Sequence, residues 1–180
     1  VSDSEKLEFV FDQSIKEFGN IDGVFHFAGV TNQNYFVPVT DLTEEINKEH
    51  FNPKLYGLMT LRQIIKKYPI DFCFVTSSIS SILGGLGFGA YACSNAYMDG
   101  VINNDLRTGS IPWINVDLDG WVSSRNMKHI NELRDQNVNI SEGVKLIENL
   151  LLLKEYGVGY VIQSKSDLSD RLKKWVINSS

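Results

Sequence analysis

The stretch IDFCFVTSSISSILGGLGFGAYACSNAYMDGV, residues 70–101, joins an apolar run to a helix-like run through a loop with four glycines in six residues. The run at 70–77 is rich in β-branched and aromatic residues and has the length of a strand buried on both faces. After the glycines, residues 90–109 have a helical pattern, and Gly109 is placed to end it. The stretch therefore predicts a strand followed by a helix, the repeating unit of α/β folds.

Strand-like and helix-like segments alternate along the rest of the chain as well. Further strands are predicted at residues 21–30, 111–118 and 158–164, and further helices at 7–18, 43–68, 141–157 and 166–176. Thr43 is expected to cap the long helix, and Pro53 to kink or interrupt it. Residues 119–138 are polar with a helical tract, which we interpret as a lid or a loop-helix segment. The pattern predicts a single α/β domain over residues 1–180, a doubly wound Rossmann-like parallel sheet that is incomplete, with about four strands.

The charge balance and the cysteine count exclude several classes of protein. The chain has 17 basic and 22 acidic residues, a net charge of −5, and no basic stripe that could neutralise a nucleic acid backbone. No apolar run approaches the roughly 18 residues that a membrane helix needs. Cys73 and Cys93 are expected to be reduced thiols, and no His or Cys spacing predicts a metal site. We expect a soluble cytoplasmic protein that binds neither nucleic acid nor membrane.

The glycine-rich loop has three interpretations. It follows a strand and precedes a helix, as a dinucleotide-binding loop does, but Gly84 comes eight residues after Thr76, where the strand is predicted to end. In a dinucleotide-binding fingerprint the first glycine lies in the turn directly after the strand. A flexible surface loop is the second interpretation. The third assigns the chemistry to the residues that flank the glycines.

Three polar side chains flank the loop. Ser78 lies at the carboxyl end of a predicted parallel strand, where open α/β sheets bind ligands. Tyr91 and Asn95 are four residues apart at the start of a predicted helix and therefore share one face. A hydroxyl, a phenol and a carboxamide in one crevice could bind a carbonyl oxygen and donate a proton to it. The alternative is that Ser78 merely starts a turn and Tyr91 packs into the core.

Several segments together resemble the ketoreductase domains of modular polyketide synthases, which are members of the short-chain dehydrogenase/reductase superfamily. These segments are IDGVFHFAGV (21–30), HFNPKLYGLMTL (50–61), residues 70–101 and INVDLDGW (114–121). The family's YxxxN pair matches Tyr91 and Asn95. Its lysine from the preceding long helix matches Lys54, and its catalytic serine matches Ser78. The similarity extends over most of the chain and includes all four catalytic positions.

The resemblance implies hydride transfer from NADPH to the β-ketone of an acyl chain tethered to an acyl carrier protein. Tyr91 would donate the proton. Because a phenol ordinarily has a pKa near 10, the ammonium of Lys54 would help by stabilising the phenolate. Ser78 would hydrogen-bond the substrate carbonyl, and Asn95 would hold the lysine or a relay water in place.

The resemblance also assigns a cofactor site. The residues that it implies for this site are Ala28, Gly29, Ser77 and Tyr91. Without the resemblance, Lys54 would be interpreted as a solvated helix lysine. Trp121 matches the family's lid region, so that it either contacts substrate or packs in the core. The three histidines have no partner pattern and are interpreted as structural or surface residues, namely His26, His50 and His129.

Part of the family's domain has no counterpart in this sequence. A complete reductase of the family opens with a strand, a glycine-rich phosphate loop and basic residues that bind the 2′-phosphate of NADPH. We therefore expect residues 1–180 to be the C-terminal catalytic portion, which a cofactor-binding portion completes among other synthase domains. Alone, it is expected to bind NADPH weakly and reduce nothing, and its strand at 21–27 to present a long apolar edge. The alternative is a non-catalytic scaffold or interaction module within a synthase.

Overall fold

A computed structural model describes the chain except for residues 31, 122–137 and 175–180. Its centre is one parallel sheet whose strands follow each other in the order β1-β2-β3-β4. The strands are β1 (Gly23–His26), β2 (Phe72–Ser78), β3 (Trp113–Leu118) and β4 (Tyr160–Ile162). The predicted α/β class with about four parallel strands is confirmed. The strand boundaries are tighter than predicted, since β1 and β4 keep only the centres of the apolar runs at 21–30 and 158–164.

One helix precedes the first strand, and the others connect the strands or follow the last one. They are α1 (Ser4–Phe18), α2 (Glu44–Phe51), α3 (Gly57–Ile65), α4 (Ser80–Leu83), α5 (Gly89–Thr108), α6 (Ile140–Leu153) and α7 (Leu168–Leu172). The Thr43 hydroxyl accepts a hydrogen bond from the Ile46 amide at 3.2 Å, so Thr43 is the predicted cap. The left-handed Gly109 ends α5, also as predicted.

The structure differs from the sequence prediction at two helices. The short helix α4 was not predicted, because four residues that include two serines carry no readable helical period. The helix predicted at 141–157 begins instead at Ile140, where Asn139 and Glu142 form a reciprocal capping box. The predicted lid or loop-helix segment at 119–138 lies mostly outside the described residues.

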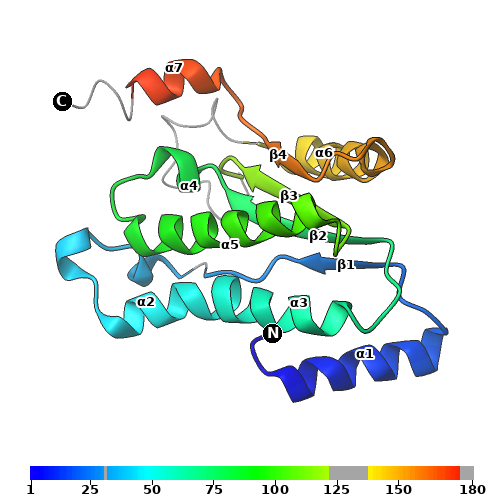
Figure 1. The fold of residues 1–180 in the computed structure, drawn as a ribbon. Coiled ribbons are helices and arrows are strands. Elements are labelled where there is room, and N and C mark those ends of the chain that lie inside the picture. Colours follow the sequence, from blue (N-terminus) through cyan, green and yellow to red (C-terminus); the bar gives the residue numbers. More distant parts are fainter. Residues whose placement is uncertain (31, 122–137, 175–180) are drawn as a thin grey trace.

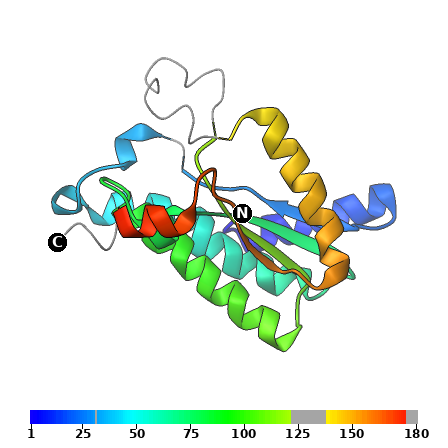
Figure 2. The same ribbon diagram turned by 90° about the horizontal axis from the view of Figure 1, so that it is seen from above.

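Helices cover both faces of the sheet and form two separate cores. Figure 1 shows α5 in front of β2 and β3, and Figure 2 shows from above that α3 and α5 lie on one side of the sheet and α6 on the other. Alternate residues of β2 point into opposite cores, because side chains along a strand alternate between faces. Cys73 and Val75 pack against α3 and α5, whereas Phe74 packs against Leu150 of α6.

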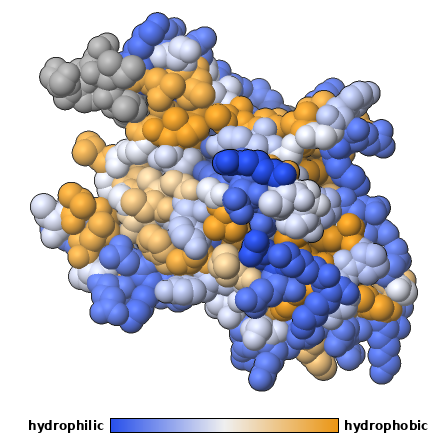
Figure 3. Space-filling view, in the orientation of Figure 1, coloured by the Kyte–Doolittle hydropathy of each residue, from blue (hydrophilic) through white to orange (hydrophobic). Residues whose placement is uncertain are grey.

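The edge strand β1 is covered less completely than the centre of the sheet. Phe25 is 48% and Phe27 is 51% exposed, although their rings contact those of Phe72 and Phe74 at centroid distances of 5.3 to 5.8 Å. β1 is an edge strand that pairs only with β2, as predicted, but at four residues it is shorter than the predicted run at 21–27. In the orientation of Figure 1, hydrophilic residues cover α2, whereas apolar surface is more frequent beside α4 (Figure 3).

Two further properties concern the chain as a whole. Cys73 is buried in β2, Cys93 is exposed on α5, and neither is in a disulfide, as predicted. Within the described residues, no helix is both long enough and apolar enough to cross a bilayer.

Candidate active site

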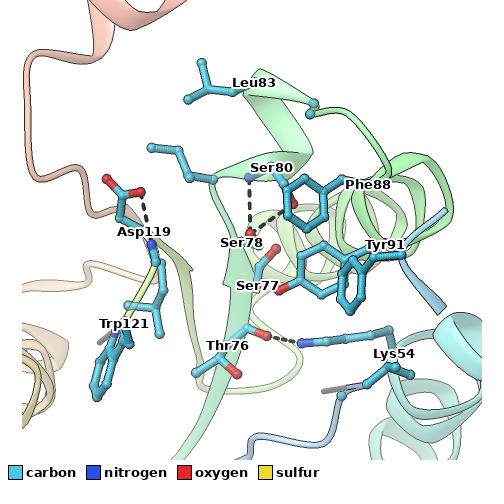
Figure 4. A pocket seen from close by; sticks show the side chains of 18 of the residues that line it. Lys54, Thr76, Ser77, Ser78, Ser80, Leu83, Phe88, Tyr91, Asp119 and Trp121 are labelled. Atoms are coloured by element: carbon cyan, nitrogen blue, oxygen red, sulfur yellow. Dashed lines mark hydrogen bonds between the residues drawn. The ribbon is translucent and has the colours of Figure 1, made fainter. Parts of the chain in front are cut away.

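A cavity of about 630 Å³ lies at the carboxyl ends of the strands. This is the edge at which open α/β sheets bind ligands, and the volume is that of a small-molecule site. Figure 4 shows the side chains of Lys54, Ser77, Ser78 and Tyr91 directed into this cavity. The fold therefore brings together four of the residues that the sequence singled out, from three separate segments of the chain.

Lys54 reaches the cavity from a distorted turn between α2 and α3. Residues Asn52–Tyr56 form a π-helical turn, in which the amide of Gly57 bonds the carbonyl of Asn52. Pro53 explains the distortion, because it has no N–H to donate and cannot continue the α-helical ladder. The interruption predicted at Pro53 is confirmed, and the lysine next to it turns toward the sheet.

The Lys54 ammonium is buried next to β2. The side chain is 5% exposed, and Nζ donates a hydrogen bond of 2.5 Å to the carbonyl oxygen of Thr76. Burial lowers the pKa of Lys54 to about 8, against the opposing effect of the Asp99 carboxylate. Lys54 therefore stays mainly protonated at neutral pH but loses its proton more readily than an exposed lysine. The interpretation as a solvated helix lysine is wrong.

His26 is the nearest titratable neighbour of Lys54 on the edge strand. It is 3% exposed, and burial together with the Lys54 charge lowers its pKa to about 4. His26 is thus neutral at pH 7, and no partner for its Nε2 lies among the described residues. His26 and His50 are both buried, as a structural role requires, and His129 lies outside the described residues.

Ser77 and Ser78 end β2 at the cavity. The Ser78 hydroxyl accepts hydrogen bonds from the amide of Ser80 at 3.2 Å and from its hydroxyl at 2.9 Å. These bonds fix Ser78 at the start of α4 and leave its own proton free to be donated into the cavity. The buried Ser77 hydroxyl makes no hydrogen bond of normal length among the described residues, but it lies near Asp117 and favours the charged form of that carboxyl.

Tyr91 lies in the first turn of α5 and is held by aromatic rings. Its ring centroid lies 5.4 Å from that of Phe36 and 5.9 Å from those of Phe88 and His50. Phe36 and Phe88 also line the cavity. The packing limits the rotation of the phenol, so its hydroxyl keeps one direction relative to Ser78.

Asn95 does not line the cavity. It is fully buried one turn after Tyr91 in α5, and its Nδ2 donates 2.8 Å to the Tyr91 carbonyl oxygen. The side chain therefore supports the helix that carries the phenol. Its Oδ1 has no partner among the described residues and remains an acceptor for a water or a neighbouring group.

The two cofactor positions predicted on the segment after β1 differ. Gly29 lines the cavity, and a Cβ built on it would approach Cε of Lys54 to 3.4 Å. A side chain at this position would therefore occupy space next to the lysine. Ala28 is partly buried and is not among the cavity-lining residues.

The glycine-rich loop returns the chain from α4 to α5 at the cavity mouth. Gly84, Gly85 and Gly87 have φ angles of 66°, 146° and 77°. These values are unfavourable for residues with a Cβ, so the loop needs glycines for its conformation. Gly84 and Gly85 line the cavity together with the flanking residues Ser78 and Tyr91.

A buried acidic pair lies behind the cavity and was missed from the sequence. Asp117 is fully buried and accepts a hydrogen bond of 2.6 Å from the Tyr160 hydroxyl, while Asp99 accepts one of 2.8 Å from Asn115 Nδ2. Burial and the Asp99 charge raise the pKa of Asp117 to about 7. The two carboxyls come from β3 and α5, and no local sequence pattern joins them.

The wall opposite Tyr91 contains Trp121, which the sequence singled out, and Asp119 and Arg171, which sequence reasoning missed. Asp119 and Trp121 follow β3 and lie on the side of the cavity away from Lys54 and Tyr91 (Figure 4). Arg171 of α7 lines the cavity as well. The sequence assigns Trp121 either to substrate contact or to the core, and its place in the cavity wall is compatible with contact.

Comparisons with known proteins agree with this arrangement. The model of the KR domain family matches residues 1–123. Polyketide synthase PksN of Bacillus subtilis strain 168 is 34% identical over 92 residues, which cover 50% of this chain and 2% of that protein. The hybrid PKS-NRPS synthetase traA of Penicillium crustosum is 30% identical over 109 residues, which cover 61% of this chain and 3% of that protein.

Solved structures with the same fold include ketoreductases. An A1-type ketoreductase superposes with a TM-score of 0.81 at 20% identity, over 98% of this chain and 37% of that chain. A ketoreductase domain from the bacillaene assembly line superposes with a TM-score of 0.76 at 21% identity, over 97% of this chain and 43% of that chain. At such identities the likeness shows the fold.

Fold and cavity together define a Rossmann-like α/β domain with lysine, serine and tyrosine gathered at the carboxyl ends of its strands. The family match covers more than half of the sequence, and the chain belongs to the KR domain family. It spans only 2% to 3% of the length of the two curated relatives described above.

Proposed function

We propose that this chain carries the catalytic residues of a ketoreductase that uses NADPH to reduce the β-ketone of an acyl chain tethered to an acyl carrier protein. The observation that carries the proposal is the meeting of Lys54, Ser78 and Tyr91 in one cavity. These residues are distant in the sequence and supply a cation, a hydrogen-bond donor and an acid. Such a set of groups suits reduction of a carbonyl, because negative charge develops on the carbonyl oxygen before it is protonated.

In the proposed reaction, Tyr91 donates its hydroxyl proton to the carbonyl oxygen. The buried Lys54 ammonium stabilises the phenolate that remains, and its charge acts strongly because little water surrounds it. Ser78, held by Ser80, donates a hydrogen bond to the same carbonyl oxygen. Asn95 supports the backbone of Tyr91 and has a free acceptor for a water that could return the proton.

Residues at the cavity fit a nicotinamide cofactor. Ser77 has a buried hydroxyl that makes no hydrogen bond of normal length among the described residues, and Gly29 leaves room next to Lys54 that a Cβ would reduce. We propose that these two residues, Ala28 and Tyr91 bind it, Ala28 through its backbone. When bound, the nicotinamide supplies the hydride. Residues of this chain orient the ketone and deliver the proton.

We further propose that a second portion completes the cofactor site. This chain aligns along nearly its whole length with the solved ketoreductases, yet it covers only 34% to 43% of four of them. The exposed rings of Phe25 in the edge strand β1 and of Phe27 directly after it offer an apolar surface for such a portion. Other synthase domains and the carrier protein are the remaining proposed partners.

The test is reduction of a β-ketoacyl thioester, followed as NADPH oxidation and product alcohol. This chain together with the cofactor-binding portion is expected to reduce the thioester, and the chain alone is not. A Tyr91→Phe variant of the assembled protein should lose about 10³-fold in kcat while folding normally. Its matched control is Tyr97→Phe, an exposed tyrosine of the same helix. Full activity of the isolated chain would contradict the two-portion proposal.

A non-catalytic scaffold within a synthase is the second candidate function. The observation that favours it is the pair of half-exposed phenylalanines in and directly after the edge strand, which suits a docking surface. The same Tyr91→Phe variant separates the candidates. Unchanged product reduction in the assembled protein would reject catalysis by this site, whereas a large loss would reject the scaffold role.

A further inference from the structure

A buried carboxylate at the turn after β3 is bound by the C-terminal segment. Asp119 is 7% exposed and accepts hydrogen bonds from the backbone amides of Gly120 at 3.0 Å and Lys165 at 3.1 Å. Its own amide donates to the side-chain oxygen of Gln163 at 3.1 Å. The Arg171 guanidinium completes the set with an ion pair to the Asp119 carboxylate. Segment 163–171 is thus bound to the cavity wall through one side chain.

Arg171 supplies the positive charge that the buried Asp119 carboxylate needs. It projects from α7, its side chain is 16% exposed, and it also donates a hydrogen bond of 3.2 Å to the Ser164 hydroxyl. A carboxylate as buried as that of Asp119 is costly without a countercharge. The charge of Arg171 therefore decides whether the Asp119 network is stable.

A second ion pair connects the same segment to α6. Nζ of Lys165 lies 2.7 Å from both carboxylate oxygens of Glu142, the residue that forms the capping box with Asn139. The next residue, Gly143, lies directly under the Trp121 indole, and a Cβ built there would collide with the ring. Segment 163–171 is therefore attached on both sides of Trp121, through Asp119 and through the start of α6.

We propose that Arg171 is a positioning residue, whose pairing with Asp119 fixes the Trp121 wall of the cavity and so determines how the acyl substrate lies beside Tyr91. The effect on substrate rests on the proposed ketoreductase function. The effect on Trp121 does not, since it follows from contacts within the chain. Arg171 lies outside residues 1–123, the part that the family model matches.

The first test reads the position of Trp121 without any turnover. The full chain is labelled with 5-fluorotryptophan, and the Trp121 resonance is assigned with a Trp121→Phe variant. Arg171→Ala is expected to shift the Trp121 signal and to leave that of Trp113, which lies in the core on the other face, unchanged. Lys173→Ala is the matched control, because it removes a cation two residues after Arg171 whose side chain is 67% exposed and pairs with Asp170, not with Asp119.

The second test connects this contact to the reaction. In the assembled reductase, Arg171→Ala should raise KM for the β-ketoacyl thioester about tenfold with a smaller change in kcat, and Arg171→Lys should restore most of it. If Arg171→Ala does not fold, Arg171→Gln takes its place, since it keeps donors but no charge. An unmoved Trp121 resonance in a folded variant overturns the proposal. A moved resonance with an unchanged KM overturns its substrate half, and absence of reduction in the unmodified protein overturns the proposed function alone.

Discussion

Asp105 and Lys54 are both buried charged groups, but they differ in their hydrogen-bond partners and in how the fold affects their charged forms. Asp105 of α5 is 1% exposed and receives two hydrogen bonds of 2.6 Å from Arg62 and one of 3.2 Å from the Trp113 indole. Hydrogen bonds from Arg62 hold its pKa below the usual range. Lys54 is 5% exposed but donates only to a carbonyl oxygen, and within the described part of the chain no carboxylate is within ion-pair distance.

This difference indicates that Asp105 contributes to stability, whereas Lys54 is suited to a role in the reaction. The fold stabilises the charged form of Asp105, which lies away from the cavity, and destabilises the charged form of Lys54, which lies in it. A group whose charge is fully compensated has little left to offer a substrate. A buried ammonium that forms no ion pair is available to an anion such as a phenolate formed during reaction.

Removing the Lys54 charge is expected to have the largest effect. A Lys54→Met variant of the assembled reductase should lose about 10³-fold in kcat, because the Tyr91 phenolate loses its stabilising cation. The free energy of unfolding should change by no more than about 1 kcal/mol, because a costly buried charge and one hydrogen bond disappear together. Steady-state kinetics and urea unfolding measure the two quantities. A variant that unfolds easily but retains kcat would reverse the comparison.

Removing the partner of Asp105 should have the opposite outcome. Arg62→Met leaves a buried carboxylate with only the indole N–H of Trp113, and the protein is expected to lose about 3 kcal/mol of stability. Reduction by the folded fraction should be unaffected. Arg107→Met, which removes an exposed arginine that forms no ion pair among the described residues, is the control, expected to change stability by less than about 0.5 kcal/mol.

His26 is a third buried ionisable group, and its effect should be visible in the pH dependence of the unfolding free energy. Its pKa falls from 6.5 in the unfolded chain to about 4 in the fold, so the unfolded state binds the proton more tightly. The His26 contribution is complete above pH 6.5 and is lost as the pH falls through 4, a difference of roughly 2 to 3 kcal/mol. The difference in unfolding free energy between wild type and His26→Gln, measured from pH 7 to 4, isolates it from the other groups. A constant difference would reject the neutral buried histidine.

The smallest expected effect concerns the pH profile of reduction. Because the pKa of Lys54 is about 8, kcat should decrease above pH 8 as the ammonium loses its proton. Asp99→Asn removes the carboxylate that opposes this loss, so the decrease should begin at lower pH. Glu45→Gln, an exposed carboxylate at the start of α2, is the control and should leave the profile in place. A profile that Asp99→Asn does not move would show that Asp99 has no influence on Lys54.

Much of the fold could be predicted because its signals are local. Thr43 precedes a helical run, Pro53 cannot continue a helix, and Gly109 accepts the left-handed conformation that ends one. Helix α4 has no such signal, because serine is as frequent in turns as at helix starts. The Asn139 and Glu142 box was readable in principle, since its residues are three apart, but Ser141 offered a competing start.

The site was only partly predictable for a related reason. Lys54, Ser78 and Tyr91 could be chosen through their resemblance to a family pattern, and the fold brings all three to one cavity. The resemblance did not indicate that Asn95 would face the helix backbone. Asp119 and Arg171 are 52 residues apart in the sequence and meet only because β4 lies beside β3. The residues that flank each of them therefore do not predict the pairing.

The position of Lys54 depends on the number of residues in the π-helical turn that carries it. Such a turn holds one residue more than an α-helical turn would, and an α-helix rotates by about 100° for each residue. Removing a single residue from Asn52–Tyr56 would therefore rotate α3 relative to α2 about the helix axis. The two helices could then not both bury their apolar faces while Lys54 still points into the cavity. This turn is therefore expected to conserve its residue count even where its residue types vary.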